Sequence, residues 1–209
     1  MLSNRLAKHF GAAAAAAVVV GSANAAIVYS GVLNFACAID IDGTYINVET
    51  AQLTNGPGSG VPGWDVNPYR SSTGSGMNFF SPTGGGMVSA TAGTGSAINL
   101  TAGTLIGSTS NYSSSTATIA FGAAAGQWQY GANNLVGFRF VGADGQTRYG
   151  WMRFLMGSQP ASGNLVTRTV VDFAYESVAG ASIGAGEFVP APGAIALLGL
   201  AGLAGRRRR

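Results

Sequence analysis

The chain has 209 residues, 33 of them glycine, with one cysteine, one histidine and only 9% charged residues. Its formal charge of +3 comes from its two ends, which contain Arg5, Lys8 and the arginines at 206–209. The body between these ends has five arginines, no lysine and all 8 acids. A weakly acidic body without clustered cations excludes a nucleic-acid binder. The single histidine, His9, lies in the N-terminal segment, so the body has none, which excludes a Ser-His-Asp triad and histidine-ligated zinc or iron.

The N-terminus has the pattern of a signal peptide over residues 1–25. Basic Arg5 and Lys8 precede an apolar run at 11–20, and small residues follow at 22–25. The run is too short to span a bilayer, which takes about 20 residues. We expect export through the Sec translocon and cleavage after Ala25 by signal peptidase. The alternative is an alanine-rich first helix of the domain.

Residues 26–188 are predicted to form one all-β domain, an antiparallel β-sandwich that is jelly-roll-like. Glycine and serine clusters recur about every ten residues and long helix-period stretches are missing, which favours short strands joined by turns. Strands are predicted at 27–33, 35–41, 44–48, 64–69, 77–80, 87–90 and 116–121. Asp42-Gly43 is predicted to join the second and third in a hairpin, residues 52–63 to be loop, residues 84–86 to be a turn, and Pro68 to mark an edge strand.

The C-terminal half gives the clearest pattern of strands. Aromatic, alternating segments at 135–141 and 146–156 flank Asp144-Gly145, which predicts a hairpin, and a further strand follows within 165–176. On the returning strand, alternation places Tyr149, Trp151 and Arg153 on one face.

Several segments of this body resemble a group of uncharacterised bacterial surface proteins, many of which end in a sorting signal. The resemblance implies no activity, because the group has none to transfer. The matching segments are 28–31 (VYSG), 43–45 (GTY), 63–69 (GWDVNPY), 137–140 (GFRF), 146–151 (QTRYGW) and 173–176 (FAYE).

The last 21 residues combine a proline-containing tether, an apolar segment at 193–205 and a basic end. As a helix the segment would span about 20 Å, short of the hydrocarbon core of about 30 Å, which suits a transient anchor. Arginines stay on the cytoplasmic side of such a segment, so the chain before it would lie on the far side. The alternative is a buried terminal helix with a basic cap.

This tail resembles the PEP-CTERM sorting signal of Gram-negative bacteria, which exosortase processes. Ala191 stands where that signal has glutamate. The resemblance implies a transient inner-membrane anchor, followed by release to the cell surface or the extracellular space. The motif residues are Val189, Pro190, Ala191, Pro192, Arg206, Arg207, Arg208 and Arg209.

Acidic residues and the cysteine suggest few sites. Asp40 and Asp42 before Gly43 are weak calcium candidates, since calcium needs six to eight oxygens and no third carboxylate follows at the usual spacing. Asp65 and Asn67 offer further oxygens from another loop, and the alternative for all four is a turn role. Cys37 is predicted to be a buried small hydrophobe, with an intermolecular disulfide or a lipid site as alternatives.

Aromatic and charged side chains leave structural and functional interpretations open. Trp64, Trp128 and Trp151, with Tyr69 and Tyr130, are candidates for a sugar-stacking platform, and the alternative is packing in the core. Cross-strand ion pairs are predicted among Arg139, Arg148, Arg153, Asp172 and Glu176. Asp172 and Glu176 would lie about 13 Å apart on one strand face, too far for a glycosidase pair.

The leading hypothesis is an exported, surface- or matrix-associated structural protein without catalysis and without a cofactor. A carbohydrate-binding module of the extracellular polysaccharide matrix is the first alternative, and a carboxylate-dependent hydrolase is the second. The expected partners are signal peptidase, the Sec translocon, exosortase and the membrane, with polysaccharide under the first alternative and no nucleic acid.

Overall fold

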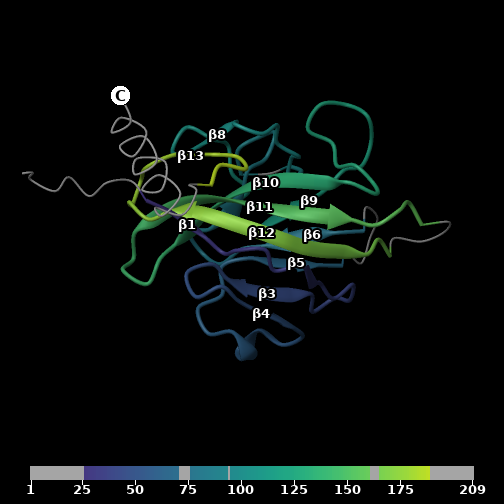
Figure 1. Cartoon of the computed structure of the whole chain (residues 1–209), viewed down its shortest axis with the longest axis horizontal. Coiled ribbons are helices and arrows are strands. Elements are labelled where there is room, and N and C mark those ends of the chain that lie inside the picture. The colour runs from purple at the N-terminus through teal and green to yellow at the C-terminus, as the bar shows by residue number, and fades with distance from the viewer. Residues whose placement is uncertain (1–25, 71–75, 94, 161–164, 189–209) are drawn as a thin grey trace, which may run out of the picture.

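The computed structural model describes residues 26–70, 76–93, 95–160 and 165–188 (Figure 1). The predicted signal peptide and sorting tail therefore lie outside the described residues. Within those ranges no helix is long and apolar enough to cross a membrane. The only helical element there is a single 3-10 turn, η1 (Gly58–Gly60).

The larger sheet is antiparallel throughout and is built around three long strands. Its order is β1 (Ile27–Tyr29), β12 (Arg168–Glu176), β11 (Thr147–Met156), β10 (Asn133–Val141) and β7 (Gly86–Met87), and β2 (Phe35–Ala36) pairs with the other end of β12. Since β10, β11 and β12 are consecutive in the chain, the centre of the sheet is a simple meander.

The hairpin between β10 and β11 confirms the turn predicted at Asp144-Gly145. Val141 lies opposite Thr147, and the Gly142 amide donates to the Gln146 carbonyl at 2.9 Å. Gly145 has a φ of 77°, in the left-handed region that glycine enters without a steric penalty.

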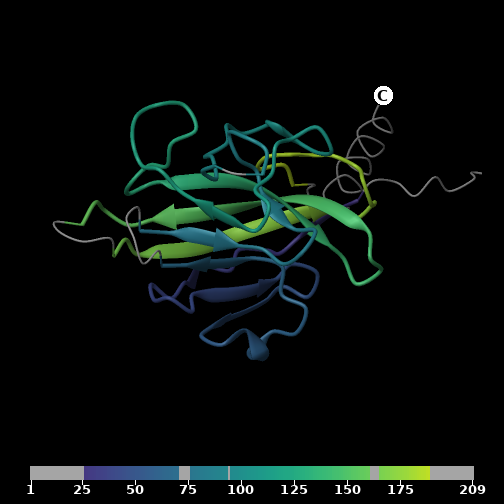
Figure 2. The ribbon, with the colours of Figure 1, turned by 180° about the vertical axis from the view of Figure 1, so that it is seen from behind.

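A second layer of short strands lies against this sheet (Figures 1 and 2). It contains the three-stranded sheet β5 (Asn67–Tyr69), β6 (Asn78–Phe80) and β9 (Thr116–Thr118), and the pair β3 (Thr44–Asn47) and β4 (Gln52–Asn55). An antiparallel bridge between Ile46 and Val66 connects the two groups. Pro68 lies in β5 at the edge of the three-stranded sheet, as predicted.

The main core fills the space between the two layers. Phe79 of β6 packs with Trp128 and with Phe154 of β11, at ring-centroid distances of 5.8 and 5.5 Å. These contacts join residues from three distant parts of the chain, so they depend on the tertiary fold.

A smaller core covers the other face of the larger sheet. It gathers Tyr149 and Trp151 of β11 under Ile106 and Ile183, from the short pair β8 (Leu105–Ile106) and β13 (Ile183–Gly184). Because Trp151 and its neighbour Met152 belong to different cores, the face division predicted for β11 is confirmed, and the strand is buried on both sides.

One predicted connection is wrong. The segment after Asp42-Gly43 does not return along the preceding strand, because β2 pairs with β12 while β3 pairs with β4, in the region predicted as loop. The turn predicted at 84–86 connects β6 in the second layer to β7 in the larger sheet. Turn residues mark where a chain reverses but do not name the strand with which it pairs.

The described residues thus form an all-β structure of antiparallel sheets, and their two-layer arrangement is consistent with a β-sandwich.

Candidate functional site

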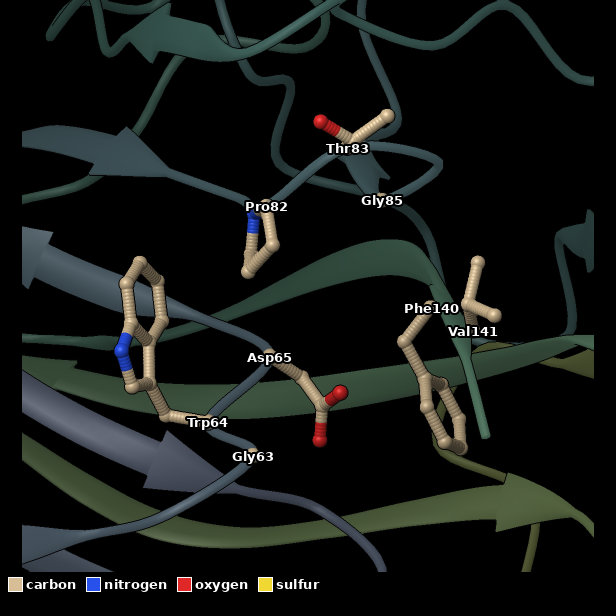
Figure 3. A pocket seen from close by; sticks show the side chains of 8 residues that line it. All are labelled: Gly63, Trp64, Asp65, Pro82, Thr83, Gly85, Phe140 and Val141. Carbon is tan, nitrogen blue, oxygen red and sulfur yellow. The ribbon is translucent and has the colours of Figure 1, made fainter. Parts of the chain in front are cut away.

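Trp64 separates two surface cavities, and we call these cavities with their lining the Trp64 site. The first cavity has a volume of about 220 Å³ (Figure 3). Its lining residues are Gly63, Trp64, Asp65, Pro82, Thr83, Gly85, Phe140 and Val141. The second has a volume of about 200 Å³. Its lining residues are Ile41, Tyr45, Trp64, Asn67, Tyr69 and Phe80.

The turn before β5 positions Trp64. Gly63 has a φ of 68°, which turns the chain just before the tryptophan. The Asn47 side chain, at the end of β3, donates from Nδ2 to the carbonyls of Pro62 and Gly63 at 2.9 and 3.0 Å. The two peptide groups that flank Gly63 are therefore both fixed to the sheet.

Four aromatic residues line the second cavity, and three of them form contacts centred on Trp64. The Trp64 ring meets Tyr45 edge-on at 4.9 Å between centroids, and it lies 5.9 Å from Phe80 at a tilt of 46°. Tyr45 and Trp64 are half-buried, whereas Phe80 is 39% exposed. Rings held at fixed angles with open faces are suited to stacking on flat apolar surfaces.

Amide and hydroxyl groups border these rings. The Asn78 side chain donates from Nδ2 to the Tyr69 hydroxyl at 3.3 Å, and Asn67 donates to the Asp42 carbonyl at 2.9 Å. The second cavity is therefore lined by uncharged side chains, since neither an acid nor a base is among its lining residues.

Asp65 is the acidic group of the first cavity. Its side chain points into the space between Trp64 and Phe140 (Figure 3), and the residue is only 8% exposed. Burial raises the pKa of the Asp65 carboxyl to about 7, the charge of Glu49 adds to the rise, and a hydrogen bond from the Val48 amide at 2.8 Å opposes it. A glycosidase uses two carboxyls, and the lining of this cavity contains one.

The predicted three-tryptophan platform is wrong for two of its members. Trp128 and Trp151 are 0% exposed. Each indole N–H donates to a backbone carbonyl at 2.8 Å, Trp128 to Ala97 and Trp151 to Glu187. Both rings lie in the cores because burial of a large apolar ring lowers the free energy of the folded state once its N–H has a hydrogen-bond acceptor.

The remaining predicted aromatics separate. Tyr69 joins Trp64 at the second cavity, while Tyr130 is half-buried and stacks on Phe121 at 3.8 Å between centroids. Sequence reasoning missed Tyr45 and Phe80. Tyr45 carried a local indication, since it alternates with buried Ile46 in a strand, but Phe80 carried none.

Asp40 has a turn role. Its Oδ1 accepts a hydrogen bond from the Gly43 amide at 2.8 Å, and Asp40 and Asp42 are both exposed. Among the residues that the structure describes, no group of three His, Cys, Asp or Glu side chains is placed to hold a metal ion.

Of the predicted cross-strand ion pairs, the structure contains that between Arg153 and Asp172. Arg148 pairs instead with Asp144 in its own hairpin, and Arg139 lies over the Tyr112 ring at 4.7 Å. The predicted burial of Cys37 is confirmed, and burial raises the pKa of its thiol.

Comparisons of the chain with protein-family models, with curated proteins and with solved structures gave no match. The predicted cleavage residue Ala25, the motif at 189–192 and the arginines at 206–209 lie outside the described residues.

Proposed function

We propose that the chain is an exported, surface- or matrix-associated β-sandwich protein without catalytic activity, delivered by a PEP-CTERM-like signal at 189–209. A Gram-negative inner membrane would hold it briefly before exosortase acts. The signal-peptide pattern at 1–25 and the tripartite tail support this proposal. A jelly-roll-like connectivity of the sandwich remains part of the proposal.

The observation that carries the proposal is the meeting of the two ends of the described domain. The Ser177 amide donates to the Ala26 carbonyl at 3.0 Å, and the rings of Tyr29 and Phe188 stack at 5.7 Å between centroids. Within the described residues, packed structure therefore includes Ala26, the first residue after the predicted signal peptide, and Phe188, the last before the predicted sorting tail. This is the arrangement expected of a closed domain between two removable segments.

The C-terminal boundary is fixed by side chains of the larger sheet. Trp151 donates from Nε1 to the Glu187 carbonyl, and the Glu187 carboxylate accepts from the Gly184 amide at 2.9 Å. Phe188 is thus held one residue before the sorting motif. Exosortase would have to cut next to the folded domain.

Fractionation of Gram-negative cells that make exosortase tests the proposal. We expect the full chain in the envelope and then at the surface. A chain ending at Phe188 should be released into the periplasm, and a chain with alanine at 206–209 should remain unprocessed. Replacing exposed Arg70 by alanine is the matched control for lost positive charge. Equal distribution of all four chains would contradict the sorting role.

Carbohydrate binding at the Trp64 site is the second candidate function. The half-exposed rings of Tyr45, Trp64 and Phe80 and the uncharged lining of the second cavity favour it. A neutral polysaccharide suits this lining, because its pyranose rings have apolar faces and hydroxyl edges while it carries no charge. The occupant would be a chain of the extracellular matrix.

Affinity electrophoresis against neutral polysaccharides tests this candidate. We expect the native protein to be retarded and Trp64→Ala to migrate freely. Tyr130→Ala is the matched control, since Tyr130 is also half-buried but lines neither cavity. Equal retardation of both variants would remove Trp64 from the binding surface.

Hydrolysis is not proposed. Asp172 is held by Arg153, and Glu176 accepts hydrogen bonds from backbone amides, so the two acids on β12 already have structural partners. Asp65 lacks a second carboxyl in the lining of its cavity.

A further inference from the structure

Glu176, the last residue of β12, is a buried acid whose bonds meet at one oxygen. It is 3% exposed. Its Oε1 accepts from the amides of Ala26 and Val178 at 2.9 and 3.0 Å, and from the Ser177 hydroxyl at 3.5 Å. The two ion pairs found among the described residues, Arg148–Asp144 and Arg153–Asp172, do not include it.

The backbone nitrogen of Ala26 is held in place by the sheet. Ile27 lies opposite Glu176 in the pairing of β1 with β12, and the Ala26 carbonyl accepts from Ser177. The nitrogen therefore faces the carboxylate because of strand register, and its position does not depend on a mobile side chain.

This nitrogen changes chemically if the signal peptide is removed where the sequence predicts. Water adds across the peptide bond between Ala25 and Ala26, the new carboxylate leaves with residues 1–25, and the nitrogen becomes an amine. An α-amine has an ordinary pKa of about 7.7–8.0, so it takes up a proton at neutral pH and carries a positive charge.

We propose that Glu176 is the receptor for the new N-terminal ammonium group of Ala26, so that removal of the signal peptide creates an ion pair that fastens β1 to the sheet. The inference rests on the proposed export and cleavage after Ala25. Before cleavage the same carboxylate has only neutral donors.

The expected gain comes from the positive charge that protonation places on the donor. The bond from an amide to a carboxylate is already charge-assisted, and an ammonium donor adds the attraction between opposite charges. Ala26 itself is solvent-exposed, which limits the gain. We therefore expect the unfolding equilibrium constant to fall by about tenfold when the free ammonium replaces a neutral amide.

Urea unfolding at pH 7 tests the proposal with chains spanning residues 26–209 in mild detergent. One chain has a free Ala26 amine. Its matched control is acetylated at that nitrogen, which keeps an N–H donor but removes the charge. The free chain should be more stable by about tenfold in the equilibrium constant, and Glu176→Gln should abolish the difference. Equal stability of the two native chains, or a difference that persists in Glu176→Gln, would overturn the proposal.

A second measurement covers the case in which Glu176→Gln does not fold. The α-amine of the folded native chain should titrate above its ordinary range and react slowly with acylating reagents, compared with the same chain in urea. An ordinary pKa in the folded chain would contradict the ion pair.

The mass of the mature chain recovered from the host separates this inference from the proposed export. A chain that begins elsewhere would refute cleavage after Ala25. The difference between free and acetylated Ala26 in purified protein would still decide whether Glu176 can receive the charge.

Discussion

Arg153 and Asp172 face each other directly across β11 and β12 and join through two hydrogen bonds. Arg153 Nε lies 2.8 Å from Oδ1 and Nη2 lies 2.7 Å from Oδ2. Tyr29 donates a third hydrogen bond to Oδ2 at 2.8 Å from β1. A single carboxylate thus ties together three neighbouring strands, and its side chain is only 2% exposed.

Replacing Asp172 by alanine should destabilise the protein by about 2–3 kcal/mol, because it leaves the partly buried guanidinium and the Tyr29 hydroxyl without their acceptor. Asp144→Ala removes the exposed pair with Arg148 and should cost much less, because water and salt screen an exposed pair. Urea unfolding of both variants measures the difference. Equal losses would show that burial of the Asp172 pair contributes nothing.

Asp65 should make stability fall as pH rises. Its pKa is raised to about 7 in the folded chain. Between the ordinary pKa of an aspartate and about pH 7, the folded state therefore binds more protons than the unfolded state. The folded chain is therefore most favoured below about pH 4 with respect to this group, and that contribution is lost as pH rises towards 7.

Asp65→Asn removes the titration and keeps an oxygen for the Val48 amide. We expect this variant to be more stable than the native chain at pH 8 by roughly 1–3 kcal/mol and to lose its dependence on pH between 4 and 7. Exposed Asp42→Asn serves as control. Parallel pH profiles for the native chain and Asp65→Asn would contradict the assignment.

Trp128→Ala and Trp64→Ala should separate stability from surface function. The first empties the main core and leaves the Ala97 carbonyl without its donor, so we expect a loss of about 3–5 kcal/mol. The second shortens a half-buried ring and should cost roughly 1–2 kcal/mol. Thermal unfolding checks both values. A larger loss for Trp64→Ala would mean that the turn before β5 is part of the core.

Arg168 should be intolerant of lysine. Its buried guanidinium donates to the carbonyls of Ala38, Tyr69 and Gly76, and burial lowers its pKa to about 10. A lysine cannot form this fork, so Arg168→Lys should lose about 2 kcal/mol. Exposed Arg70→Lys is the matched control, and similar unfolding midpoints for the two variants would refute the structural role.

The parts of the fold that sequence predicted depend on neighbours along the chain. Asp144-Gly145 fixes its hairpin through local backbone geometry, and alternation divides Trp151 from Met152 whatever lies above or below them. The strand at 52–55 was not predicted, because three of its four side chains are polar and β3, with which it pairs, was expected to pair with the strand before Asp42.

The Trp64 site depends on contacts that no local pattern records. Tyr45, Trp64 and Phe80 meet because β3, β5 and β6 stand side by side in one layer, and that order is set by long-range pairing. Nothing in the local sequence distinguishes Trp128 and Trp151 from Trp64. They are buried because the second layer covers Trp128 and the β8–β13 pair covers Trp151.

The attachment of the C-terminal stretch to Trp151 and Tyr29 has a mechanical consequence. If the chain is anchored through its tail, tension on that tether enters the domain at the indole hydrogen bond and the Tyr29–Phe188 ring stack, beside the middle of the larger sheet. The first event under load would then be the release of a few residues at 183–188. Their release would lengthen the tether while the central strands stay intact.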